Sequence, residues 1–375
     1  MTILTIGICS VLVLFAFTTP LCNGFFRKIK NMRVASSSEL PRFSVVMTVH
    51  DNASELERNL PLILGQDYKP GFEVIVVDES STDDTEDVLK RFKKIYSNLY
   101  VTFIPESSHY LSRRKLALTV GIKAAKNEWV IFIDADCRPE GYMWLESMAK
   151  YCTDNSDLVL GYTNYTDDSP LFCRFERLLT SCYVFRKAQV GIAYRYNGNN
   201  LAFRKSVFMS HNGFLRNLKY LRGEYDFIVN EYASKGRAFA VTDKRAMVRQ
   251  DAPSEKAWIN THLHYMETRK HLKRSIPYRI LWNIDTLLLH LNYGIIVLSA
   301  AYSMYFHDMF VAVAVLLAFI VTFFARIVIA KKAAGLFDEN LPGLAIPFME
   351  LRMLWQNIYF LLLHKCSDKY KFIRK

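Results

Sequence analysis

The cysteines of this chain show none of the spacings that mark a zinc site or a disulfide framework. Seven cysteines are present, an odd number, and no two of them stand as Cys-x-x-Cys. Structural zinc sites use closely paired cysteines, and disulfide-stapled secreted domains usually carry an even number. The pattern therefore argues against a zinc site of this kind and indicates a reducing compartment.

Acidic residues are fewer than basic residues in this chain. The chain has 36 Asp and Glu against 48 Lys and Arg, which gives a formal net charge of +12, yet 51% of its residues are hydrophobic. Apolar and basic residues are concentrated in different segments, as is typical of a chain anchored at an anionic membrane face. We therefore attribute the excess positive charge to a membrane and expect no nucleic-acid partner.

No Lys or Arg precedes the first apolar run, which covers residues 3–21. A bilayer core takes roughly 20 helical residues to cross, so this run is long enough to span. A cleaved signal peptide is the rival interpretation, but it needs a basic start and a small-residue cleavage site, which residues 19–22 lack. Basic residues follow the run instead, at Arg27, Lys28, Lys30 and Arg33. The positive-inside rule then puts the N-terminus outside and the chain beyond Arg27 in the cytoplasm.

A short apolar run at residues 129–133 leads directly into Asp134 and Asp136, with Pro139 soon after. Such a run predicts a buried parallel strand that opens into a loop, the edge at which α/β sheets bind ligands. Strand alternation would put both carboxylates on one side, where they can share a divalent cation. A solvated loop is the alternative.

The surrounding region alternates strand-like and helix-like segments. Strands are expected at residues 43–50, 72–78 and 99–104, and helices after residues 53 and 84 and over 116–125. Ser54 and Glu57 indicate a capping box at the start of the first helix. Because this order implies right-handed crossovers, the sequence predicts an α/β domain with a mostly parallel sheet.

Four segments resemble the successive motifs of inverting family-2 glycosyltransferases, which have a Rossmann-like GT-A fold. They are residues 43–52, 76–84, 115–125 and 132–136, and further similarity lies at 198–206, 212–214 and 223–230. The resemblance covers residues 42–275. Within this family, the chain is most similar to the membrane-attached members common in Bacteroidetes-type bacteria, which have one N-terminal span and a hydrophobic C-terminal region.

The resemblance implies a donor site for a UDP- or GDP-sugar with Mg²⁺ or Mn²⁺. Its expected members are Thr48 and His50 around the base, Asp78 and Glu79 on base or ribose, Arg114 or Lys115 over the nucleotide, Asp134 facing ribose and metal, and Asp136 on the metal. Read without the resemblance, His50 can be a strand-end residue, and residues 113–115 a solvated helix start.

Inversion needs a base that takes the acceptor proton. The resemblance assigns this base to Asp226, with Glu224 as second choice, although Tyr225 interrupts the acidic pair. Capping of a helix expected over 227–234 is the alternative. The resemblance also places Gly198, Asn199, Asn200 and Trp258 around the transferred sugar and the acceptor, where a plain tight turn is the alternative for the first three.

The Gln-x-x-Arg-Trp motif that related processive synthases carry near Trp258 is absent, which favours transfer of a single residue. Downstream, His262, His264 and His271 can include a metal ligand, but we expect them on a basic face beside the membrane. Upstream, residues 171–190 fit either an interfacial amphipathic helix or a buried core helix.

Two further spans are expected at residues 284–305 and 309–330, joined by a connector, 306–308, without Lys or Arg. Basic residues on both sides of this pair put its ends in the cytoplasm: Arg269, Lys270, Lys273, Arg274 and Arg279 before it, and Lys331 and Lys332 after it. Residues 344–364 are apolar but contain Glu350 and Arg352, so we expect an in-plane or re-entrant helix.

The predicted organisation is an N-terminal anchor (1–26), a basic and polar linker (27–41), a GT-A domain (42–275), two transmembrane helices (276–332) and an interfacial or re-entrant helix with a basic tail (333–375). The predicted function is metal-dependent, non-processive glycosyl transfer to a lipid-linked or membrane-borne glycan acceptor at the bacterial inner (cytoplasmic) membrane, for cell-envelope polysaccharide. The alternatives are a processive polysaccharide synthase and an inactive nucleotide-binding assembly protein.

Overall fold

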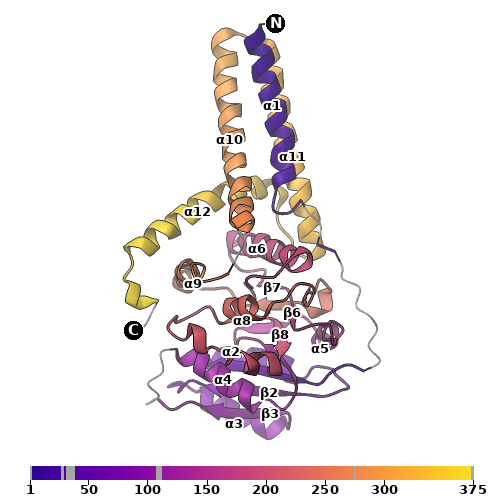
Figure 1. Cartoon of the computed structure of the whole chain (residues 1–375), viewed down its shortest axis with the longest axis vertical. Helices are drawn as coiled ribbons and strands as arrows, with labels where there is room; N and C mark the ends of the chain where they lie inside the picture. The colour runs from indigo at the N-terminus through magenta and orange to yellow at the C-terminus, as the bar shows by residue number, and fades with distance from the viewer. Residues whose placement is uncertain (1, 27–28, 31–38, 107–111, 274–275, 373–375) are drawn as a thin grey trace. The chain divides into compact units, whose positions relative to one another are not determined.

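The computed structural model describes residues 2–26, 29–30, 39–106, 112–273 and 276–372 (Figure 1). The chain forms two compact units. A helical unit comprises residues 1–28 and 274–359, and a sheet unit comprises residues 29–273 and 360–375. Arg27, Lys28, Arg33 and Arg274, which enter the orientation argument, lie outside the described residues.

A seven-stranded sheet in the order β3-β2-β1-β4-β8-β6-β9 forms the core of the sheet unit. Its strands are β1 (Phe43–Val49), β2 (Phe72–Asp78), β3 (Leu99–Phe103), β4 (Trp129–Phe132), β6 (Leu158–Leu160), β8 (Leu201–Arg204) and β9 (Ala238–Ala240). β1 pairs in parallel with β2 and β4, β2 with β3, and β6 with β9, whereas β8 is antiparallel to both its neighbours. The predicted mostly parallel α/β sheet is confirmed.

Helices connect the parallel strands: α2 (Ala53–Leu64), α3 (Thr85–Ile95) and α4 (Arg113–Ala124). Helix α4 lies against β1 and β2, and Gly121 permits this close approach. A Cβ atom at Gly121 would stand 2.6 Å from Cγ1 of Val46. A larger residue there would therefore push the helix off the sheet.

The expected capping box at Ser54 and Glu57 is wrong. Helix α2 begins at Ala53, and the Ser54 hydroxyl donates to Glu55. The neighbouring loop supplies the cap instead, because Asp83 accepts a hydrogen bond from the Ala53 N–H at 3.1 Å. A side chain distant in sequence thus satisfies a helix-end donor that local capping would otherwise serve.

A smaller sheet of β5 (Cys137–Pro139), β10 (Val248–Gln250) and β7 (Thr163–Tyr165) lies beyond the end of β4. Helix α6 (Leu171–Val190) packs on β7 and β9, and most of its side chains are buried, which favours the core-helix alternative for this segment. The remaining helices of the sheet unit are α5 (Trp144–Ala149), α7 (Lys205–Ser210), α8 (Glu224–Tyr232) and α9 (Glu255–Thr268), with 3₁₀ turns η1 (Leu215–Asn217), η2 (Lys244–Ala246) and η4 (Lys369–Lys371).

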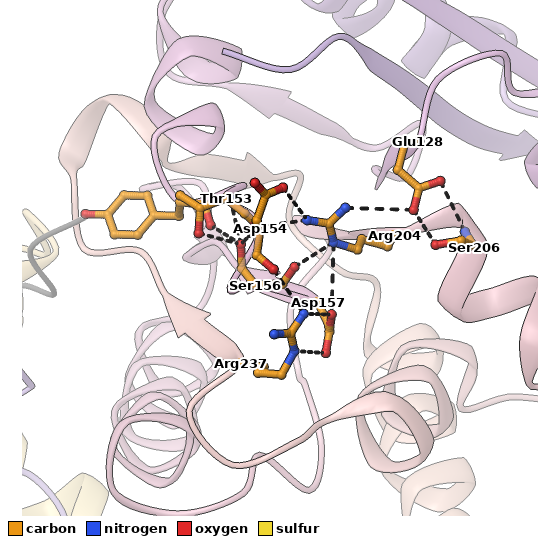
Figure 2. Close-up of polar contacts among 9 residues, drawn as sticks. Glu128, Thr153, Asp154, Ser156, Asp157, Arg204, Ser206 and Arg237 are labelled. Carbon is orange, nitrogen blue, oxygen red and sulfur yellow. Dashed lines mark hydrogen bonds and ion pairs between the residues drawn. The ribbon is translucent and has the colours of Figure 1, made fainter. Parts of the chain in front are cut away.

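A polar network fastens the sheet at the amino end of β4 (Figure 2). Arg204 donates to the carbonyl oxygens of Thr153 and Ser156, both at 2.9 Å, and its guanidinium lies 5.0 Å from the ring centroid of Trp129. Arg237 forms a two-pronged pair with Asp157, with distances of 2.5 and 2.7 Å. These contacts join β4, β6, β8 and β9 at the end of β4 opposite to Asp134 and Asp136.

Three helices are long and apolar enough to cross a membrane, counted among the described residues: α1 (Ile3–Cys22), residues Asn283–Phe306 of α10 (Ile276–Phe306), and α11 (Met309–Leu336). They pack on one another in the helical unit. Helix α12 (Ile346–Cys366), which follows the η3 turn (Gly343–Ala345), is not among the three. The in-plane or re-entrant placement of residues 344–364 stays a prediction.

One buried arginine ties the helical unit together. Arg326 of α11 is 1% exposed and donates from Nε to Glu350 of α12 at 2.6 Å. Its Nη atoms both lie 3.1 Å from Oδ1 of Asp285 in α10, and Nη1 also reaches the carbonyl oxygen of Thr19 in α1 at 3.0 Å. Glu350, which interrupts the apolar pattern of the last helix, is therefore an internal ion-pair partner.

Candidate active site

The loops that follow β1 and β2 are bound to each other. Oδ1 of Asp78 accepts hydrogen bonds from the backbone N–H and the hydroxyl of Ser81, at 3.0 and 2.6 Å. Asp51 accepts a bond from the Thr82 N–H at 2.7 Å. Asp78 thus shapes the turn after β2, while the side chain of His50 at the end of β1 is 56% exposed, with Nε2 3.7 Å from Oδ2 of Asp51.

Glu79 lies deeper than His50. Burial raises the pKa of the Glu79 carboxyl, although the positive charges of Arg114 and Arg222 oppose this rise. The buried side chain of Thr48 stands beside Glu79. The structure therefore brings Thr48 and Glu79 to the same edge of the sheet as Arg114, as expected from the sequence.

Arg114 and Tyr225 converge on Asp134. Oδ1 of Asp134 accepts a hydrogen bond from Nη2 of Arg114 at 2.5 Å and from the Tyr225 hydroxyl at 2.9 Å. Desolvation opposes the charge of Arg114, but the carboxylates of Asp134 and Glu224 hold its pKa well above the ordinary value. The three side chains form a charged cluster that joins α4, the end of β4 and α8.

Asp136 is held by residues other than those that bind Asp134. Its Oδ2 accepts a hydrogen bond from Gln250 Nε2 at 2.7 Å, and its Oδ1 accepts a weak bond from the Cys137 thiol at 3.3 Å. Burial, together with repulsion from Asp134, raises the pKa of Asp136 to about 6. The two aspartates are thus close enough to influence each other, as a shared site requires.

Strand alternation, which was expected to put Asp134 and Asp136 on one side, is not what brings them together. Strand β4 ends at Phe132, and Asp134 and Asp136 lie in the turn between β4 and β5. The carboxylates are brought together by this turn, which the backbone bond from Cys137 N–H to the Asp134 carbonyl closes at 3.0 Å. Strand alternation does not act there, because no strand extends that far.

Lys115 faces away from this cluster. Its side chain is fully buried, and Nζ donates to the carbonyl oxygens of Asn217 and Tyr220, both at 2.7 Å. Burial lowers the pKa of Lys115 to about 8. Of the two basic residues proposed to lie over the nucleotide, Arg114 therefore points to the carboxylates, whereas Lys115 supports the segment before α8.

Helix α8 begins at Glu224, three residues earlier than expected, so both candidate bases stand in its first turn. Gly223 precedes it with φ of 97°, a left-handed conformation that glycine adopts without strain. Neither carboxylate makes a side-chain cap bond to this helix. The capping alternative for Asp226 is therefore not supported.

Glu224 and Asp226 differ in their surroundings. Oε2 of Glu224 lies 4.0 Å from Nε of Arg114, so this carboxylate belongs to the cluster around Asp134. Oδ1 of Asp226 accepts bonds from the Tyr196 N–H at 3.1 Å and from Nε of Arg195 at 3.3 Å. Burial raises the pKa of Asp226 against the pull of Arg195, which suits a proton acceptor.

The loop at residues 198–200 has two different asparagines. Asn200 is fully buried, donates to the Ala246 carbonyl at 2.8 Å and accepts from Trp144 Nε1 at 3.0 Å, so its amide serves the fold. Asn199 donates to the Cys137 sulfur at 3.3 Å and thus reaches the aspartate turn. Gly198 is required because a Cβ there would stand 2.6 Å from the Tyr196 hydroxyl oxygen.

Trp258 and the downstream histidines form a separate cluster. The ring centroid of Trp258 lies 4.7 Å from that of His262 and 5.3 Å from that of Phe360. His262 Nε2 is 2.8 Å from Glu176, and His271 Nε2 is 3.2 Å from Glu267. His262 is therefore largely buried and both rings are paired with carboxylates, whereas the basic face beside the membrane stays a prediction.

Sequence reasoning missed three residues of the site. Tyr225 was visible only as an interruption of the acidic pair, and Gln250 and Arg195 stand in no recognised motif. Within the described parts of the chain, no group of three or more His, Cys, Asp or Glu side chains is arranged to hold a metal ion. Asp134 and Asp136 therefore stand as a pair of carboxylates without a third such ligand among the described residues.

Sequence comparisons identify the family of this region. The family described as Glycosyl transferase family 2 matches residues 44–222. Glycosyltransferase AglE of Haloferax volcanii is 30% identical over 132 residues, which are 35% of this chain and 42% of AglE. The putative teichuronic acid biosynthesis glycosyltransferase TuaG of Bacillus subtilis is 31% identical over 139 residues, 35% of this chain and 51% of TuaG. The chain spans about half the length of these relatives.

Among solved structures, mannosyltransferase PcManGT from Pyrobaculum calidifontis, in complex with GDP-Man and Mn²⁺, is similar with a TM-score of 0.53 and 17% identity. The similarity covers 94% of this chain and 98% of that one, and at this identity it concerns the fold alone. The similarity to Bacteroidetes-type members stays a prediction. This chain contains a glycosyl transferase family 2 domain with a GT-A fold.

Proposed function

We propose that the protein transfers one sugar from a UDP- or GDP-sugar, with inversion, to a lipid-linked or otherwise membrane-borne glycan acceptor. The observation that carries this proposal is the pair Asp134 and Asp136 at the carboxyl end of β4, faced by Arg114 and by the carboxylates of α8. Ligands of parallel α/β sheets bind at this edge. The processive synthase and the inactive binding protein are the alternatives that the test must separate.

The aspartate pair fits Mg²⁺ or Mn²⁺ by its donor chemistry. Hard cations of this type prefer carboxylate oxygens and usually combine one or two of them with the phosphates of a substrate. Asp134 and Asp136 supply two carboxylates without a complete protein cage among the described residues. When bound, such a cation would neutralise the diphosphate that departs from the sugar.

The nucleotide would lie over the ends of β1, β2 and β4. His50 offers an exposed ring for stacking on a base, and Glu79 beside Thr48 offers acceptors for base N–H or ribose hydroxyl groups. Arg114 adds a positive charge next to the aspartates. These are the groups we assign to the donor, with Asp78 shaping the turn that carries them.

Asp226 is our choice for the general base. Oδ1 is held by Arg195 and Tyr196, while no described residue binds Oδ2, which is left to accept the proton of an acceptor hydroxyl. Glu224, our second choice, lies beside Arg114, with Oε2 4.0 Å from Nε of the guanidinium. Gly198, Asn199 and Trp258 remain candidates for the sugar and acceptor region.

The acceptor class and the localisation rest on the apolar helices and on the relatives. Three helices can span a membrane by length and composition, and TuaG is named for the biosynthesis of teichuronic acid. Both features support a cell-envelope acceptor at the bacterial inner membrane. The missing Gln-x-x-Arg-Trp motif supports transfer of a single residue.

The test is a screen of the full-length protein, purified in detergent, against UDP- and GDP-sugars with Mn²⁺ and a membrane-lipid extract. We expect one nucleotide sugar to be consumed, with nucleoside diphosphate released and one sugar added per acceptor. Asp136→Asn should abolish the reaction, whereas Asp154→Asn should retain it, because Asp154 is exposed and its partner Arg204 lies at the other end of β4. Long products would indicate a synthase, and no consumption of any donor would indicate an inactive binding protein.

A further inference from the structure

Tyr225 occupies the position that separates the two acidic residues at the start of α8. Its hydroxyl donates to Oδ1 of Asp134 at 2.9 Å, across 91 residues of sequence. Its ring is fixed edge-on between Phe132, at a centroid distance of 5.8 Å, and Tyr196, at 6.3 Å. The hydroxyl therefore cannot swing freely away from the carboxylate.

The consequence for Asp134 is a fixed orientation. An oxygen of a carboxylate has two lone-pair directions, and Oδ1 of Asp134 uses them on Tyr225 and on Nη2 of Arg114, 2.5 Å away. No described residue donates a hydrogen bond to Oδ2 of the same carboxylate. Two donors thus share one oxygen, and the lone pairs of the other oxygen are not taken by any described residue.

We propose that Tyr225 is a positioning residue for the metal and nucleotide site. Its hydroxyl, together with Arg114, holds Asp134 so that Oδ2 faces the cation, and it ties the first turn of α8, which carries Asp226, to the aspartate turn. This inference rests on the proposed function. Outer hydrogen-bond partners of this kind orient the ligands of metal sites and tune their affinity.

Tyr225→Phe tests the role of the hydroxyl, because it removes one oxygen and retains the ring contacts. Tyr232→Phe is a matched control on the same helix: Tyr232 is buried, and its hydroxyl donates to the Gly213 carbonyl at 3.3 Å, away from the aspartates. The probe is Mn²⁺ in the presence of UDP or GDP, titrated by calorimetry against the full-length protein in detergent.

We expect Tyr225→Phe to weaken Mn²⁺ binding about 10-fold to 100-fold, the range found for such partners, while Tyr232→Phe binds as the wild type does. Thermal midpoints of the two variants should be similar to each other. If Tyr225→Phe binds Mn²⁺ like the wild type while Asp134→Asn does not bind, the proposal is overturned and Tyr225 only packs. If the wild type binds no Mn²⁺ with either nucleotide, the metal-dependent function itself fails.

Discussion

Nε of Arg195 lies 3.3 Å from Oδ1 of Asp226, and the Tyr196 N–H holds the same oxygen from the neighbouring position. The guanidinium of Arg195 in turn lies 3.7 Å from the ring centroid of Tyr265 on α9. The carboxylate is thereby fixed through one oxygen, while no described residue binds the other. This asymmetry is what a general base needs, since it must keep its place and still accept a proton.

The first prediction therefore concerns Asp226 and Glu224. Asp226→Asn should lower turnover about 100-fold to 10,000-fold and leave donor affinity near the wild-type value, because a base acts in the transition state and does not hold the donor. Glu224→Gln should have the smaller effect on turnover. Steady-state rates and nucleotide binding of both variants provide the measurement. A dead Glu224→Gln beside an active Asp226→Asn would transfer the base to Glu224.

The second prediction concerns orientation in the membrane. A reporter fused after Lys332 should be on the cytoplasmic side, and one inserted in the connector at residues 306–308 should be in the periplasm, because basic residues flank the pair of spans and the connector has none. Fusions to an enzyme active only in the periplasm can measure this. The reverse pattern would contradict the cytoplasmic placement of the GT-A domain.

Much of the fold could be predicted because its signals are local. The apolar runs of β1, β2 and β4 end where charged residues begin, and the observed strands end within one residue of those expected for β1 and β2. Parallel order follows from the alternation with helices. The edge of the sheet that carries Asp134 and Asp136 could thus be predicted from the sequence.

The groups that complete the site could not be predicted, because they come from distant segments. Tyr225 is 91 residues from Asp134, and Gln250 is 114 residues from Asp136. No periodic pattern within one segment of the sequence indicates such a pair. The same limit applies to His262, whose carboxylate partner Glu176 lies on α6, 86 residues earlier.

The third prediction concerns Arg326. Arg326→Met would leave the carboxylates of Asp285 and Glu350 facing each other without their shared cation, and loss of one member of a buried ion pair costs about 3 to 5 kcal/mol of unfolding free energy. Lys331→Met on the same helix is the control, because Lys331 is exposed and donates to the Leu341 carbonyl, at 2.8 Å, with no ion pair to any described residue. Unfolding in detergent, followed by tryptophan fluorescence, should separate the two variants. Equal stability would mean that the ion pairs add nothing to the helical unit.

The last prediction concerns the pH dependence of stability and rests on His262. Burial opposes protonation of this ring, but the attraction and hydrogen bond of Glu176 outweigh it, together with a bond to the Trp258 carbonyl, so the pKa of His262 is raised from 6.5. Both ring nitrogens face acceptors, at 2.8 Å each, which only the doubly protonated ring can satisfy. The charged form is therefore the one that the fold prefers.

The direction in which stability changes with pH follows from this preference for the charged ring. A group whose pKa is higher in the folded state adds stability that is fully present below its unfolded pKa of 6.5 and is lost as the pH rises through the folded pKa. The wild type should exceed His262→Gln in thermal midpoint by more at pH 6 than at pH 8. Glu176→Gln should remove the same pH dependence, because it removes the group that raises the pKa. A difference between wild type and His262→Gln that is constant from pH 6 to pH 8 would show that the pKa of His262 is the same in the folded and unfolded states, and would contradict a stabilising charged pair with Glu176.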